Sequence, residues 1–145
     1  MKSFNVRVYG LLINSRNELL LSDERRGGVS FTKFPGGGLE FGEGVADALI
    51  REFSEELAIH VTVGDLFYVN DFFQVSAFNE NHQLLSFYYF VNYNKCEEIG
   101  QEKYQFPLQE EGEKQRWIAI SDLTEADFTF PIDKVVIEKL KFYKF

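Results

Sequence analysis

The segment that most restricts the fold of this chain is a glycine-rich stretch followed directly by a strongly amphipathic helix. Five of the nine residues from Gly36 to Gly44 are glycine, which is atypical of ordinary helix or strand because glycine loses more conformational freedom on folding than any other residue. The next segment, Val45–Leu57, repeats its apolar residues at helical spacing. We therefore expect a loop that leads into a helix, whose apolar face is formed by Ala46, Leu49, Ile50, Phe53 and Leu57.

The polar face of the expected helix carries three carboxylates. Residues three and four positions apart are neighbours on a helix, so Glu52 faces Glu55 and Glu56. Each like-charged pair costs roughly 0.2–0.5 kcal/mol even when exposed, and a divalent cation reverses this cost because Mg²⁺ and Mn²⁺ prefer oxygen ligands. Arg51 lies one turn before Glu55 and is placed to pair with it. The competing interpretation, an ordinary solvated acidic face, is the commoner one for an isolated cluster.

The rest of the chain alternates between β-rich segments and one further helix. Val6–Ile13 and Glu18–Ser22 flank a turn and predict a hairpin, whereas Asp23–Lys33 is expected to be looser. Further β-rich segments are Val61–Asn70, Phe72–Phe78, Leu84–Tyr93 and Arg116–Ile120, and a second helix is expected from Pro131 to about Tyr143. This order favours an α/β fold in which a mixed β-sheet is covered by helices.

Length and composition indicate one independent domain, residues 1–145. With 145 residues, of which 45% are hydrophobic, the chain can bury a core without disulfides. Cys96 is the only cysteine, which suits a reducing cytoplasm. The residues after Met1 have no long apolar run, so we expect neither a signal peptide nor a membrane span.

The net charge of −8 argues against a long nucleic-acid partner, which would require a basic surface. It allows a small phosphorylated substrate that is held by a few local cations or by a metal ion. The aromatic content of 17% is compatible with a homodimer.

The glycine segment and the helix together form a spaced signature. Five residues separate Gly37 from Glu43, and seven more separate Glu43 from the pair Arg51-Glu52. The full set is Gly37, Glu43, Arg51-Glu52, Glu55-Glu56 and the closing apolar Ile59. This pattern resembles the Nudix box, the signature of the Nudix (MutT-like) hydrolases. Two positions depart from it, since Ala58 stands where the family usually has Gly and Phe53 where a smaller aliphatic is common.

The resemblance implies an α/β/α sandwich with a mixed sheet, and an enzyme that hydrolyses a nucleoside diphosphate linked to another group. It implies that Glu52 and Glu56 are the principal ligands of Mg²⁺ (or Mn²⁺), with Glu55 as a third ligand or acting through a water. It also implies that Arg51 and Glu43 orient this cluster. The backbone of the glycines, Gly37 among them, is expected to face the metal and the substrate.

Residues outside the signature complete the expected site. Arg25, Arg26 and Lys33 precede the glycine segment and are candidates for binding outer phosphate oxygens, although solvated surface charges are at least as common. Many family members carry another acidic residue in a late loop, and Glu111 is our choice here, with Glu110 and Glu113 as competitors. The general base, Glu55 or Glu111, is left open. Aromatic residues that either stack on a base or fill the core are Tyr68, Phe72, Phe73, Tyr88 and Tyr89.

We therefore expect metal-dependent hydrolysis of a phosphoanhydride bond, in which a metal-activated water attacks phosphorus. The alternative is a non-catalytic module of Nudix fold that binds or senses a nucleotide. An isomerase of isoprenoid diphosphates is disfavoured because no cysteine precedes the box. Nucleoside triphosphates, sugar nucleotides and other small diphosphates all remain candidate substrates.

Overall fold

The computed structural model describes residues 1–144, which fall into two compact units. The first unit contains Met1–Leu11 and Pro35–Tyr93, and the second contains Leu12–Phe34 and residues 94–144. Each unit is built around a sheet of its own.

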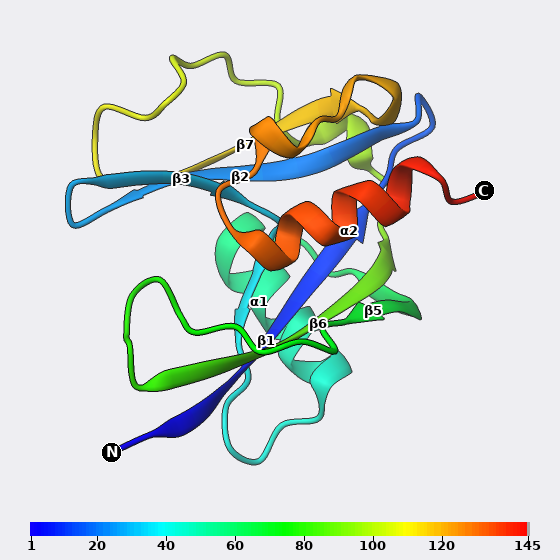
Figure 1. The fold of residues 1–145 in the computed structure, drawn as a ribbon. Coiled ribbons are helices and arrows are strands. Elements are labelled where there is room, and N and C mark those ends of the chain that lie inside the picture. The colour runs from blue at the N-terminus through cyan, green and yellow to red at the C-terminus, as the bar shows by residue number, and fades with distance from the viewer. Residues whose placement is uncertain (145) are drawn as a thin grey trace. The chain divides into compact units, whose positions relative to one another are not determined.

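The sheet of the first unit has the strand order β4-β1-β6-β5 (Figure 1). The strands are β1 (Ser3–Leu12), β4 (Gly36–Gly38), β5 (Thr62–Val69) and β6 (His82–Asn92). The helix α1 (Val45–Leu57) packs against β4 and β5, and β4 forms one edge of the sheet. The carboxylate-bearing helix therefore lies next to the strand that the glycines form.

Helix α1 has the bounds that the periodicity predicts. Its C-terminus shows which backbone conformation Ala58 adopts at the position where the family usually has glycine. Gly44 is the N-cap, and Ala58 ends the helix in the left-handed conformation (φ 56°, ψ 35°) while its N–H donates to the Ser54 carbonyl. Leu49 and Phe53 are buried as predicted, but at the start of the helix Ala48 is buried and Ala46 is exposed.

Phe53 is accommodated by a glycine on the neighbouring strand β1. A Cβ atom at Gly10 would lie 2.4 Å from Cε1 of Phe53, so the ring of this fully buried residue covers the place where another side chain would be. The absence of a side chain at Gly10 thus explains why α1 carries a phenylalanine at this position.

The sheet of the second unit has the order β3-β2-β7, with β2 (Glu18–Arg26) between β3 (Val29–Lys33) and β7 (Gly112–Ala119) (Figure 1). All its strand pairs are antiparallel. The helix α2 (Pro131–Lys141) starts with Pro131 at its first turn and buries an apolar stripe, and the short 3-10 helices are η1 (Cys96–Glu98), η2 (Ile120–Asp122) and η3 (Glu125–Asp127).

Three predictions about strands are wrong. The expected hairpin is reduced to one bridge, Ile13 to Leu19, because β1 and β2 belong to different sheets. The stretch expected to be loose forms the last four residues of β2 and all of β3. The glycines, expected outside regular strand, form β4 because they pair with β1 through Gly36–Gly38.

Phe72–Phe78 is the remaining predicted β segment that does not form a strand. Asn70 is buried, and its side chain donates to the carbonyls of Phe72 and Leu84 at 3.0 and 3.1 Å and accepts the Ser86 N–H at 2.8 Å. These bonds take the place of ladder pairing where the chain leaves the sheet. Neither helix within residues 1–144 is long and apolar enough to cross a membrane.

We predict that Ala58→Gly stabilises the protein by about 0.5–1 kcal/mol. A non-glycine residue pays roughly 1–2 kcal/mol in the left-handed conformation, and the greater freedom of glycine in the unfolded chain offsets about 0.4–1 kcal/mol of that gain. Urea unfolding measures the change. Asn17→Gly is the matched control, since Asn17 has the same φ of 56° and asparagine tolerates this conformation. An equal gain in both variants, or a loss at Ala58, would contradict the explanation.

Candidate active site

The edge strand β4 brings the helix carboxylates next to exposed backbone. A Cβ atom at Gly37 would lie 2.6 Å from the carboxylate atoms of Glu52, closer than side-chain carbons approach, so a side chain here would displace this carboxylate from its present position. Gly36 has φ 145°, and a Cβ atom on it would lie 2.1 Å from the Val8 carbonyl oxygen. Gly36 is therefore required by its backbone conformation and by its close approach to β1, whereas Gly37 leaves the space that the Glu52 carboxylate occupies.

The outer edge of β4 is bonded to α1. The register pairs Gly37 with Val8, so the alternation of an antiparallel ladder directs the polar groups of Gly36 and Gly38 away from β1. The Gly36 N–H donates to Oε2 of Glu56 at 3.2 Å, and the Gly38 carbonyl accepts a bond from Nη2 of Arg51 at 2.9 Å. These bonds fix α1 to the glycine strand.

Arg51 gathers the acidic residues of the site into one network. Its Nε and Nη2 atoms donate to the two oxygens of Glu43 at 2.6 and 2.9 Å. Its Nη1 atom donates to Glu52 at 3.1 Å and to Glu55 at 3.2 Å, and Glu40 lies 3.8 Å away. The side chains of Glu52 and Glu43 are 13% and 18% exposed, whereas that of Glu55 is 60% exposed.

The protonation equilibria follow from this network. Hydrogen bonds from Arg51, and then the backbone N–H of Glu40, hold the pKa of Glu43 below its ordinary value. The hydrogen bond to Glu43 is also the main cause that raises the pKa of Arg51, ahead of Glu52 and against the effect of desolvation. Both members of the pair are therefore charged at neutral pH. Glu52, Glu55 and Glu56 offer only oxygen donors, the type that Mg²⁺ and Mn²⁺ prefer.

A second arginine lies near this cluster and was missed by the sequence analysis. Arg7 on β1 pairs in register with Gly38. Burial lowers the pKa of Arg7, but Tyr9 and, to a smaller extent, Glu52 and Glu56 raise it above its ordinary value. Its position in an ordinary alternating strand gave no signal, because only the pairing of β1 with β4 brings it here.

The candidate phosphate-binding cations all lie in the second unit and differ in the partners and the exposure of their side chains. Lys33 is nearly buried, with its ammonium 2.8 Å from Glu24 and 3.2 Å from the Phe34 carbonyl. Arg26 lies 3.0 Å from Glu24 and 3.4 Å from Glu113, and its side chain is 61% exposed. Arg25 donates to Ser30 at 3.1 Å and is 30% exposed. Arg26 is thus the most accessible of the three.

Glu111 is bound to the turn between β2 and β3. Its carboxylate accepts the N–H groups of Gly27 and Gly28 and lies 3.7 Å from Nε of Arg25. The side chain is 60% exposed. These contacts give Glu111 a structural partner within its own unit, and its role in the reaction stays a prediction.

Strand β2 also buries two carboxylates that the sequence analysis did not single out. Asp23, 1% exposed, accepts bonds from Thr32 at 2.6 Å and from Arg116 at 2.7 Å. Glu24 is 2% exposed, and although burial opposes its ionisation, Lys33, Arg26 and Ser22 hold its pKa below the ordinary value. The signal was the run Ser22–Arg26, in which acidic residues directly follow the apolar Leu19–Leu21.

The candidate aromatic residues divide into core and surface. Tyr88 is 1% exposed and stacks on Tyr9 at 5.2 Å between ring centroids, so it belongs to the core. Phe73 is 70% exposed. Only an exposed ring such as Phe73 is accessible for stacking on a base without rearrangement.

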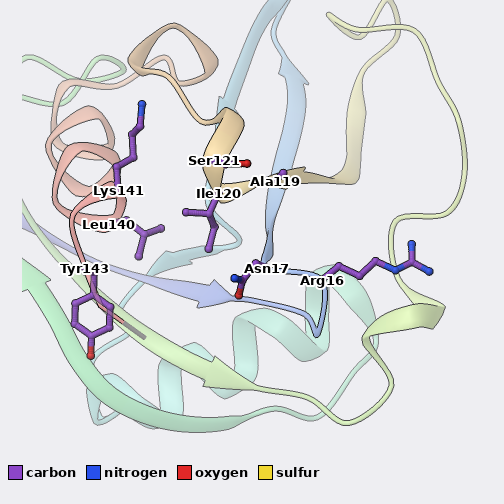
Figure 2. A pocket seen from close by; sticks show the side chains of 8 residues that line it. All are labelled: Arg16, Asn17, Ala119, Ile120, Ser121, Leu140, Lys141 and Tyr143. Atoms are coloured by element: carbon purple, nitrogen blue, oxygen red, sulfur yellow. The ribbon is translucent and has the colours of Figure 1, made fainter.

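A hollow of about 330 Å³ lies in the second unit, and none of the candidate site residues named above lines it. Figure 2 shows the side chains of Arg16 and Lys141 extending away from one another at its border. Its lining residues are Arg16, Asn17, Ala119, Ile120, Ser121, Leu140, Lys141 and Tyr143. None of them belongs to the acidic cluster, so the cavity gives no further information about the candidate chemistry.

Comparison with known proteins identifies the family. The model of the NUDIX domain matches residues 3–140, and the chain therefore belongs to the Nudix family and is a Nudix hydrolase. It is similar to the 8-oxo-dGTP diphosphatase of Escherichia coli (strain K12), with 29% identity over 143 residues that cover 97% of this chain and 98% of the relative.

Solved structures confirm the α/β/α Nudix fold. A MutT protein from Methanosarcina mazei Go1 matches with a TM-score of 0.70 at 18% identity, over 96% of this chain and 94% of the other. The MutT protein of methicillin-resistant Staphylococcus aureus 252 matches with a TM-score of 0.60 at 24% identity, over 97% and 98%. At these identities the likeness concerns the fold alone.

We predict that the stability contributed by Glu43 depends on pH. A carboxyl whose folded-state pKa is lowered stabilises the fold fully above its unfolded-state pKa, and the effect is lost as pH falls through the folded-state pKa. Glu43→Gln should therefore destabilise the protein at pH 7, with a difference from the wild type that shrinks below the ordinary value of 4.5. Urea unfolding between pH 3 and pH 7, in steps of about half a unit, measures this difference.

Glu40→Gln is the control for this series, because Glu40 is 68% exposed and 3.8 Å from Arg51. It should cost less at every pH. A deficit in Glu43→Gln that stays constant down to pH 3 would show that the carboxylate charge is not what Arg51 stabilises.

Proposed function

We propose that this Nudix hydrolase is a divalent-metal-dependent nucleoside triphosphate diphosphatase, with 8-oxo-dGTP as the first candidate substrate. The observation that carries the proposal is the network in which Arg51 and the glycine edge of β4 gather Glu52, Glu55 and Glu56. The full-length similarity to an 8-oxo-dGTP diphosphatase favours a nucleoside triphosphate over a sugar nucleotide.

The proposed metal ligands are Glu52 and Glu56, with Glu55 as a third ligand or acting through a water. Their oxygens suit Mg²⁺ (or Mn²⁺), which is commonly bound by few carboxylates together with substrate phosphates and waters. The partial burial of Glu52 and the greater exposure of Glu55 support this division. We keep Gly37 in the site as the position whose missing side chain admits Glu52.

The proposed reaction is hydrolysis at phosphorus. Glu52 and Glu56 would hold the metal, which when bound would neutralise phosphate charge and lower the pKa of a water so that hydroxide is available at neutral pH. The oxygen of this water would form the new bond to phosphorus while its proton passes to the base, Glu55 or Glu111, and the phosphoanhydride P–O bond would break with its electron pair leaving on pyrophosphate. Arg51, held by Glu43, keeps the carboxylates in place. Glu55 and Glu111 remain the candidate bases, since each is more than half exposed.

Among the candidate cations we assign outer phosphate binding first to Arg26, because its side chain is 61% exposed, compared with 30% for Arg25 and 7% for Lys33. We propose that residues 1–145 act as one Nudix domain, as the match over residues 3–140 supports. The proposed setting is the cytoplasm, without long nucleic acid or membrane as a partner, and the homodimer stays a prediction.

We predict that Glu56→Gln keeps the fold and lowers turnover by more than the roughly 10–100-fold that loss of an outer-shell partner of a metal site costs. The amide oxygen of glutamine can still accept the Gly36 N–H, whereas the charge that binds the metal is removed. Glu80→Gln, on an exposed turn of the same unit, is the matched control and should keep full activity. A normal rate in Glu56→Gln would show that the metal assignment is wrong.

The substrate is tested by screening the purified protein with Mg²⁺ and with Mn²⁺ against nucleoside triphosphates, 8-oxo-dGTP, sugar nucleotides, ADP-ribose and dinucleoside polyphosphates. We expect EDTA-sensitive release of pyrophosphate and a nucleoside monophosphate, identified by chromatography. If no compound is hydrolysed although a nucleotide raises the melting temperature, the proposal fails in favour of a binding module.

A further inference from the structure

Arg7 lies beside the acidic cluster but is not part of the network that holds it together. It is partly buried on β1, opposite Gly38 of β4. Its Nη1 atom lies 3.4 Å from the place where a Cβ atom of Gly38 would be, while the carboxylate of Glu52 lies against the equivalent place on Gly37. Successive residues of a strand direct their Cβ positions to opposite faces, so Arg7 and Glu52 flank the bare glycine strand from its two sides.

The guanidinium of Arg7 is held in place by contacts with Tyr9 that use its Nε atom and its face. Its Nε donates to the Tyr9 hydroxyl at 3.2 Å, and its carbon lies 5.8 Å from the centroid of the same ring. Tyr9 is 8% exposed and stacks on the buried Tyr88. This aromatic pair is a rigid support that orients the arginine without using its terminal nitrogens.

The terminal nitrogens of Arg7 have no hydrogen-bond or ion-pair partner within residues 1–144. Arg51 differs in this respect, because its donors reach Glu43, Glu52 and Glu55 as well as the Gly38 carbonyl. Glu52 and Glu56 act on Arg7 electrostatically and favour its charged form, yet neither makes an ion pair with it. A fixed cation with four unused N–H donors is therefore available at the edge of the acidic cluster.

We propose that Arg7 is a substrate-binding residue whose terminal nitrogens donate to the phosphate oxygens of the nucleotide at the glycine strand. The inference rests on the proposed function, which places a triphosphate against Glu52 and Glu56. Guanidinium groups match phosphate geometry with two parallel hydrogen bonds. A phosphate at the open edge of the glycine strand would be attracted by Arg7 from one face and by a metal held by the carboxylates from the other.

A structural role for Arg7 would have different consequences. If it served only to balance the charge of Glu52 and Glu56, its removal would destabilise the folded protein and change binding of every ligand alike. If it binds phosphate, its removal weakens nucleotide binding alone. Binding of a metal without nucleotide should then be unchanged or tighter, because a positive charge near the carboxylates has been lost.

The test uses Arg7→Met and Arg7→Lys in the full chain. The first probe is the α,β-methylene analogue of dGTP with Mg²⁺, measured by calorimetry, and the second is Mn²⁺ alone, measured by electron paramagnetic resonance. We expect Arg7→Met to weaken binding of the analogue by about 10- to 100-fold, to raise KM more than it lowers kcat, and to leave Mn²⁺ affinity undiminished. Arg7→Lys should restore part of the loss. Arg16→Met, at an exposed position of the second unit, is the control.

Unchanged binding of the analogue by Arg7→Met overturns the inference. A parallel loss of Mn²⁺ affinity, analogue affinity and melting temperature also overturns it, because a structural role predicts that pattern. A wild-type protein that binds the analogue through Arg7 but hydrolyses no nucleotide supports this inference and contradicts the proposed function, so the two fail separately.

Discussion

The bidentate ion pair between Arg51 and Glu43 is the interaction on which the rest of the site depends. Three carboxylates on one helix face repel each other, and a helix alone has no means of holding them together. Arg51 counters that repulsion by bonding Glu52 and Glu55, and it connects the helix to the sheet through the Gly38 carbonyl. Because Glu43 takes two of its donors, the guanidinium has one orientation, and the acidic groups are positioned by it before any ligand is bound.

The glycine strand gives this network its location. β4 lies at the edge of its sheet, where backbone groups face outward rather than toward another strand, and its lack of side chains lets Glu52 come within contact distance. The same principle operates beneath the helix, where Gly10 leaves room for Phe53. Two departures from the usual Nudix signature are thereby understood locally: Phe53 fits over a glycine, and Ala58 ends the helix in a conformation that glycine would adopt with less strain.

Patterns within short stretches of the sequence predicted the features that depend on neighbouring residues, such as the bounds of a helix. The bounds of α1 follow from its apolar spacing, and the residues of the Nudix signature define the helix face and the loop. The pairing of strands did not follow, because sequence neighbours such as β1 and β2 enter different sheets, and the glycines join β1 from a distance along the chain. Arg7 was missed for the same reason, and Lys33 was predicted to bind phosphate although it pairs with the buried Glu24 of the neighbouring strand. The roles of Glu111 and of the catalytic base stay predictions.

The central claim is that the carboxylates gathered by Arg51 at the edge of β4 hold the catalytic metal. The most direct measurement is an anomalous difference map from a crystal of the wild-type protein grown with Mn²⁺ and a non-hydrolysable nucleoside triphosphate. The account predicts a peak within about 2.2 Å of carboxylate oxygens of Glu52 and Glu56, the distance usual for such ions, with a phosphate oxygen in the same coordination shell. A fully occupied nucleotide whose only Mn²⁺ peak lies away from both glutamates would contradict it.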